Sequence, residues 1–158
     1  LYHDAFSEKN YEFFEKNIYI KLYKSGFEVF KNYPLLGVGN KNYRVETCSE
    51  KAKKFDYYCL THPHQVYFEL LSEHGLIGTT ILLSLFFYLI FKNLKIMLLS
   101  QNYIQIGAFI YLLSTFLPLL PSGSFFSDFN ITLFFINLSL MYGVNKDTNN
   151  FFKKINVT

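Results

Sequence analysis

The sequence predicts an all-α integral membrane protein, in which a polar N-terminal region precedes three transmembrane helices. Three observations favour this class. Of the 158 residues, 51% are hydrophobic and only 17% are charged, which is more apolar than a typical soluble domain. The charge is unevenly distributed, because the stretch 76–144 carries only Lys92, Lys95 and Asp128. Three apolar runs in that stretch are each about long enough to cross a hydrocarbon core of roughly 30 Å.

Residues 1–33 form the first predicted element, an amphipathic helical region. Charged residues alternate with aromatic and aliphatic ones at helical spacing, as on a helix that lies on a bilayer or a partner. The element ends at Tyr33, because the residue before a proline is pushed out of the helical region. Gly37 and Gly39 follow, and we expect them in a tight turn with positive φ. A dinucleotide-binding loop is disfavoured, since no strand precedes the two glycines.

A polar, lysine-rich segment at 41–61 is expected to be an irregular loop, so that residues 1–75 form one extramembrane region. The apolar runs then cover 76–99, 104–120 and 125–144, and residues 146–158 form a polar tail. Lysines lie in the linker after the first run and in the tail, whereas the loop after the second run has no basic residue. We therefore expect 1–75 on the external or periplasmic side and the tail in the cytoplasm.

The two cysteines, Cys48 and Cys59, both lie in the predicted external region. In an oxidising compartment the simplest outcome is a Cys48–Cys59 disulfide, which would stabilise the loop by about 3 kcal/mol in the chain-entropy model. A zinc site built from the cysteines with His62 and His64 is the alternative. We disfavour it, because the spacing resembles no common tetrahedral set.

The segment 61–78 holds three of the four histidines at the boundary between polar and apolar halves. His64 follows Pro63, which is favoured in a first helical turn, so we expect His64 near the start of a helix. Its imidazole suits a general base, although an interfacial histidine without a role is an equally good reading. Glu69 and Glu73 share a helix face and could orient an imidazole, pair with a lysine or act as in glycosidases; a structural or exposed face is favoured.

Arg44 is the only arginine in the chain. A single guanidinium among lysines favours a need for its planar, bidentate geometry, which matches phosphate oxygens, although chance would also leave one arginine in a lysine-rich chain. The net charge of +3 is spread without a basic stripe, so nucleic acid is not an expected partner.

Five short motifs resemble the O-antigen ligase and polymerase family of bacterial membrane glycosyltransferases. Residues 30–39 resemble F-x-x-x-P-L-x-G-V-G, and Asn42 to Arg44 with Cys48 resemble N-F-R followed by a cysteine. Residues 59–65 resemble C-x-T-H-P-H-N, 70–78 resemble L-L-x-E-x-G-L-I-G, and 121–126 resemble P-S-G-N-F-F. The motifs extend over most of the chain, and we expect it to be the C-terminal part of a larger polytopic protein with a GT-C-like fold.

The resemblance implies a metal-independent, inverting glycosyltransferase of the bacterial inner membrane that uses no cofactor. Its partners would be an undecaprenyl-diphosphate-linked glycan donor, a lipid or glycan acceptor and membrane lipids. By motif position, His64 would activate the acceptor hydroxyl and Arg44 would bind the donor diphosphate. Where relatives often carry an arginine or a histidine as the second cation, Lys21 or Lys24 would substitute as a point charge. Further substrate contacts are expected from His62, Gln65 and Glu73.

A different class also fits the sequence. A non-catalytic membrane protein, whose external loop binds a polysaccharide or a partner protein, would leave Arg44 and His64 without a common task. The two hypotheses differ in whether these side chains serve one site.

Overall fold

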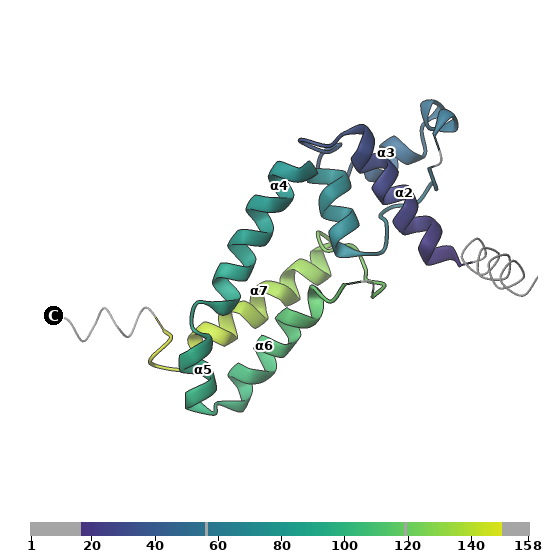
Figure 1. Ribbon diagram of the computed structural model, residues 1–158. Helices are drawn as coiled ribbons and strands as arrows, with labels where there is room; N and C mark the ends of the chain where they lie inside the picture. The colour runs from purple at the N-terminus through teal and green to yellow at the C-terminus, as the bar shows by residue number, and fades with distance from the viewer. Residues whose placement is uncertain (1–16, 56, 119, 150–158) are drawn as a thin grey trace, which may run out of the picture. The chain divides into compact units, whose positions relative to one another are not determined.

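The computed structural model describes residues 17–55, 57–118 and 120–149, and these residues are helical or irregular, without a β-strand (Figure 1). They form two compact units. The first contains the described residues as far as Thr79 together with 120–124, and the second contains 80–118 and 125–149. The all-α class predicted from the sequence is confirmed for the described residues.

Helix α2 spans Ile18–Asn32 and begins where Asn17 caps it, with the Asn17 Oδ1 atom accepting from the Tyr19 N–H at 3.0 Å. Its buried residues recur at helical spacing along one face: Leu22, Ser25, Gly26 and Val29. The amphipathic helix predicted over 1–33 is confirmed for this part. The remainder of that prediction, residues 1–16, lies outside the described residues.

Two short helices lie in the segment 41–61, where the sequence predicts an irregular loop. Helix α3 spans Tyr43–Thr47 and the 3₁₀ helix η1 spans Glu50–Lys54. The Thr47 hydroxyl donates to the Tyr43 carbonyl at 3.0 Å, and the Ser49 hydroxyl accepts from the Ala52 N–H at 3.2 Å. The prediction is wrong at these residues, because a helix of five residues is too short to show a hydrophobic period.

Helix α4 spans Val66–Phe91 but is broken at Gly75, whose φ of 62° and ψ of −169° are not helical. Helix α5, Leu94–Ser100, follows after a short turn. Within the described residues, Val66–Ser100 is the one stretch that is long and apolar enough, by length and composition, to cross a membrane. Its part after Gly75, residues 76–91, carries no charged side chain, and we call it the apolar segment.

Helices α6 and α7 are shorter than the runs that predict them. Helix α6 spans Tyr103–Thr115 and α7 spans Asp128–Gly143, which corresponds to about 20 and 24 Å. Helix α6 ends at Thr115, three residues before Pro118, and α7 begins after Ser127, whose side chain accepts from the Asn130 N–H. That α6 and α7 cross the membrane stays a prediction.

The second unit has an aromatic core between α4, α6 and α7, and Figure 1 shows α6 and α7 side by side. Every pair among four phenylalanine rings lies 5.1–6.0 Å apart: Phe86, Phe116, Phe125 and Phe134. The buried Gln105 amide donates to the Met141 carbonyl at 2.6 Å and to the Thr148 hydroxyl at 3.1 Å. These bonds join the beginning of α6 to the end of α7.

Candidate active site

Residues 34–39 run alongside α4 at its break and form the frame of the candidate site. Four backbone hydrogen bonds of 2.8–3.2 Å join the two segments. The N–H groups of Val38, Gly39, Leu76 and Ile77 donate to the carbonyls of Ser72, Glu73, Pro34 and Leu35, respectively. A broken helix leaves carbonyls before the break and N–H groups after it without helical partners, and these bonds satisfy them. We call residues 34–39 with 72–77 the glycine crossing.

Two glycines make this close approach possible. Gly37 has φ of 67°, and a Cβ atom there would lie 2.3 Å from the backbone carbon of Glu73. A Cβ atom on Gly75 would lie 2.4 Å from the carbonyl of Leu35. Both positions therefore need glycine for space as well as for positive φ. The turn predicted at Gly37 and Gly39 is confirmed, whereas the break at Gly75 was not predicted because the apolar pattern continues through it.

Glu73 lies just before the break and is buried, with 2% of its surface exposed. Its Oε2 atom accepts from the Lys41 N–H at 2.9 Å. Burial raises the pKa of the Glu73 carboxyl to about 7, while backbone hydrogen bonds from Lys41 and Tyr43 act in the opposite direction. Glu73 is not part of the apolar segment, which begins at Leu76. Its burial against the backbone favours a positioning role over the predicted contact with substrate.

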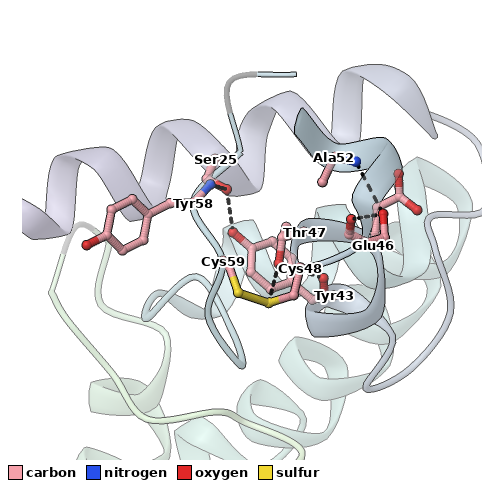
Figure 2. Close-up of a disulfide and its surroundings, with 9 residues drawn as sticks. Ser25, Tyr43, Glu46, Thr47, Cys48, Ala52, Tyr58 and Cys59 are labelled. Carbon is pink, nitrogen blue, oxygen red and sulfur yellow. Dashed lines mark hydrogen bonds between the residues drawn. A yellow bond between two sulfur atoms is a disulfide. The ribbon is translucent and has the colours of Figure 1, made fainter. Parts of the chain in front are cut away.

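The backbone that Glu73 binds leads directly into α3, which carries Arg44. The Arg44 side chain is exposed, whereas its neighbour Tyr43 is fully buried. The Tyr43 hydroxyl donates to the Ser25 hydroxyl at 2.8 Å, which in turn accepts from the Tyr58 N–H at 2.9 Å (Figure 2). Burial raises the pKa of Tyr43 to about 12. Tyr43 thus fixes α3 against α2 and leaves the guanidinium beside it free to meet solvent or ligand.

The other end of α3 is joined to the segment before His62 by the Cys48–Cys59 disulfide (Figure 2). The Cys48 N–H donates to the Arg44 carbonyl at 3.0 Å, so the first sulfur follows directly from the helix that carries Arg44. Cys59 lies three residues before His62 in the chain. Within the described ranges, no group of three or more histidine, cysteine, aspartate and glutamate side chains is arranged to hold a metal ion.

His64 lies in the loop that precedes α4, and its φ of 55° is left-handed. As predicted, it lies near the start of a helix: α4 begins at Val66 and Gln65 caps it, with the Gln65 Oε1 atom accepting from the Phe68 N–H at 3.0 Å. Gln65 is buried, with 2% of its surface exposed, which favours a structural role over the predicted substrate contact. The rings of His64 and Tyr19 pack edge to face, with their centroids 6.3 Å apart.

The rings of His62 and His64 lie against each other, with centroids 4.0 Å apart. The Thr61 hydroxyl lies 3.0 Å from Nδ1 of His62, while Nε2 is buried and has no hydrogen-bond partner in the described part of the chain. Burial lowers the pKa of His62, the charge of His64 lowers it further, and the backbone of Ser122 acts in the opposite direction. The surroundings therefore favour the neutral form of the His62 imidazole.

The loop 120–124 also belongs to the first unit and contacts the histidine segment. The Ser122 N–H donates to the His64 carbonyl at 2.8 Å, and the Ser124 hydroxyl donates to Oε1 of the buried Glu69 at 2.5 Å. The sequence analysis did not identify Ser122 or Ser124 as site residues, and it weighed Glu69 but favoured a structural or exposed face for it. The only signal for the two serines was their position in the last of the five motifs.

The first unit thus supports two exposed or half-exposed groups from one buried frame. Glu73 and Tyr43 hold the segment that carries Arg44, whereas Gln65 and Ser122 hold His64. No hydrogen bond or ring contact among the described residues joins Arg44 to His64. Lys21 and Lys24 lie on the exposed side of α2.

Comparison with known proteins agrees with the motif resemblance. The matching family model is that of O-antigen ligase, and it covers residues 4–83, including α2, α3, the glycine crossing and the histidine pair. No curated protein and no solved structure matches the chain. Since the matched residues make up half of the 158, the chain belongs to the O-antigen ligase family, whose members act in glycan transfer.

Proposed function

We propose that this chain takes part in the transfer of a glycan from an undecaprenyl-diphosphate carrier to a lipopolysaccharide or polysaccharide acceptor at the periplasmic face of the inner membrane. An acceptor hydroxyl attacks the anomeric carbon, and the carrier diphosphate leaves from the opposite face, so the configuration inverts. No metal ion takes part. The observation that carries the proposal is that the family match includes both Arg44 and His64.

His64 accepts the proton of the attacking hydroxyl. An imidazole can do so near neutral pH when its ring is held in position. The Ser122 N–H and the Gln65 cap hold its backbone on either side, and the His62 ring packs against it. Because burial lowers the pKa of His62 and favours its neutral form, this ring adds little repulsion to the proton that His64 receives.

Arg44 binds the diphosphate and stabilises the negative charge that develops on it as the bond to the sugar breaks. The guanidinium presents paired N–H donors whose geometry matches two phosphate oxygens. Such donors lower a barrier most when they are fixed before the reaction. The buried Tyr43 and the disulfide restrain α3 at its two ends, and Lys21 and Lys24 add positive charge on the exposed side of α2.

Two observations support a periplasmic location for the first unit. A disulfide is stable in an oxidising compartment such as the periplasm and rare in the cytosol. The first unit also contains residues on both sides of 80–118, so the chain leaves this unit and returns to it. Two crossings between Thr79 and residue 120, followed by a third in α7, satisfy this return and place the lysine-bearing tail in the cytoplasm.

The test is glycan transfer by His64→Ala and Arg44→Ala variants of the full-length protein, assayed by gel analysis of lipopolysaccharide in cells that lack the wild-type gene. Both variants should lose transfer while protein levels in the membrane remain normal. Arg44→Lys keeps the charge but not the paired geometry, and it should retain only a small part of the activity. Lys54→Ala, which removes an exposed cation from η1, is the matched control and should transfer normally.

Near-normal transfer by either alanine variant would remove that residue from the mechanism. Normal transfer by both would leave a binding role for the external region, as in the non-catalytic alternative.

A further inference from the structure

Four large aliphatic side chains are exposed around the glycine crossing. They are Leu35, Leu36, Leu76 and Ile77, with 61%, 72%, 54% and 48% of their surface exposed, and we call them the aliphatic rim. All four belong to the first unit. A contiguous set of exposed aliphatic side chains marks a surface that meets another apolar phase or partner.

The two halves of the rim cannot separate without breaking backbone hydrogen bonds. Leu76 donates to Pro34 and Ile77 donates to Leu35, at 2.8 and 3.2 Å. Backbones joined in this way lie about 5 Å apart. This distance is about the rise of a single helical turn, so Leu35 and Leu36 lie within roughly one turn of the start of the apolar segment.

We propose that Leu35 and Leu36 insert into the acyl-chain region of the bilayer, beside the first turn of the apolar segment, and so attach the glycine crossing to the membrane surface. The apolar segment begins with Leu76 and Ile77, and its composition suits a hydrocarbon core. Side chains fixed to its first turn enter the same layer, since apolar groups at an interface are buried by about 5–10 Å.

The lack of charged side chains around the aliphatic rim favours lipid over a protein as the partner of this surface. Residues 33–40 carry no charged side chain, and neither does the apolar segment, while Glu73, the one acidic residue of the glycine crossing, is buried with 2% of its surface exposed. A protein-binding patch is usually bordered by polar and charged side chains, whereas a surface that enters acyl chains excludes charge. The inference goes beyond the proposed reaction, because it concerns how the first unit is held against the membrane.

Single tryptophan variants test the proposal, because the chain has no tryptophan of its own. Leu36→Trp reports the surroundings of the aliphatic rim, and Ile77→Trp reports those of the apolar segment. Val45→Trp is the matched control. Val45 is 68% exposed, close to the 72% of Leu36, but it lies on α3 between Arg44 and Glu46. Each full-chain variant is reconstituted in phosphatidylethanolamine and phosphatidylglycerol vesicles, with and without bromine atoms on the acyl chains.

Leu36→Trp and Ile77→Trp should lose most of their fluorescence in brominated vesicles and resist acrylamide added to the water. Val45→Trp should show the opposite behaviour. If Leu36→Trp follows Val45→Trp, or if it is shielded from both quenchers as it would be by a protein partner, the proposal is wrong. Absence of bromine quenching at Ile77→Trp would also overturn it, since the apolar segment would then lie outside the bilayer.

Two controls separate this result from others. Resistance of Cys48 and Cys59 to thiol labelling before reduction checks that each variant retains its fold. Quenching at Leu36 should be unchanged by His64→Ala, so failure of the membrane contact and failure of the proposed transfer reaction are distinguishable.

Discussion

At the scale of single residues, Glu73 links stability to pH. The fold raises the pKa of this carboxyl from 4.5 to about 7, so the folded protein holds the proton more tightly than the unfolded chain. The stabilisation is complete below pH 4.5 and is lost as the pH rises through 7. Glu73→Gln retains an oxygen for the Lys41 N–H and removes the titration. We expect its free energy of unfolding in detergent, obtained from thermal unfolding, to vary less between pH 5 and pH 8 than that of the wild type, by an amount on the order of 1–2 kcal/mol.

The control for this experiment is Glu46→Gln. Glu46 is half-buried, and its carboxylate accepts from the Tyr33 hydroxyl at 3.1 Å, so the same chemical change is made at a less buried site of the same unit. Its pH profile should follow that of the wild type. An unchanged profile in Glu73→Gln would mean that the buried carboxyl does not control the pH dependence.

At the scale of elements, the glycine crossing determines where α4 breaks. Gly75→Ala introduces a methyl group 2.4 Å from the Leu35 carbonyl at a residue with positive φ. Either the backbone hydrogen bonds of the glycine crossing or the non-helical conformation at residue 75 must therefore be lost. We expect a loss of stability of about 2–4 kcal/mol together with loss of transfer.

Gly107→Ala is the matched control. Gly107 is exposed on α6 with no atom near its Cβ position, so alanine should be neutral or stabilising by up to about 1 kcal/mol. Equal stability of the two variants, measured by thermal unfolding in detergent, would contradict this account of the crossing.

The same element shows what the sequence could and could not predict. The turn at Gly37 was predictable because Pro34 and two glycines restrict the local backbone. The break at Gly75 was not, because it depends on hydrogen bonds to residues about 40 positions earlier in the chain, while the local pattern continues as an apolar helix. Pro63 correctly indicated a helix start close to His64, whereas the capping of α4 by the Gln65 side chain was not predicted. Local signals thus located most elements, whereas the partners of Glu73 and Ser122 required the tertiary fold.

At the scale of the whole molecule, the return of residues 120–124 to the first unit constrains the path of the chain. This loop forms hydrogen bonds with His64 and Glu69, so the proposed topology must place it on the same side of the membrane as the candidate site. In the proposed topology the chain therefore crosses the membrane an even number of times between Thr79 and residue 120. Helix α6 corresponds to only about 20 Å, so it crosses a core of roughly 30 Å only with help from flanking residues or a locally thinner bilayer.

Thiol labelling from outside the inner membrane tests this path. Cys48 and Cys59 are in a disulfide and should react with an impermeant maleimide only after reduction, so a single added cysteine can be read without reductant. Gly123→Cys, in the exposed part of the returning loop, should label in cells with an intact inner membrane. Lys146→Cys, beyond α7, should label only after that membrane is opened, because the proposed topology separates it from the first unit by an odd number of crossings. Labelling of both positions from outside would mean that α7 does not cross, and labelling of neither would place the candidate site in the cytoplasm, where no periplasmic donor could reach it.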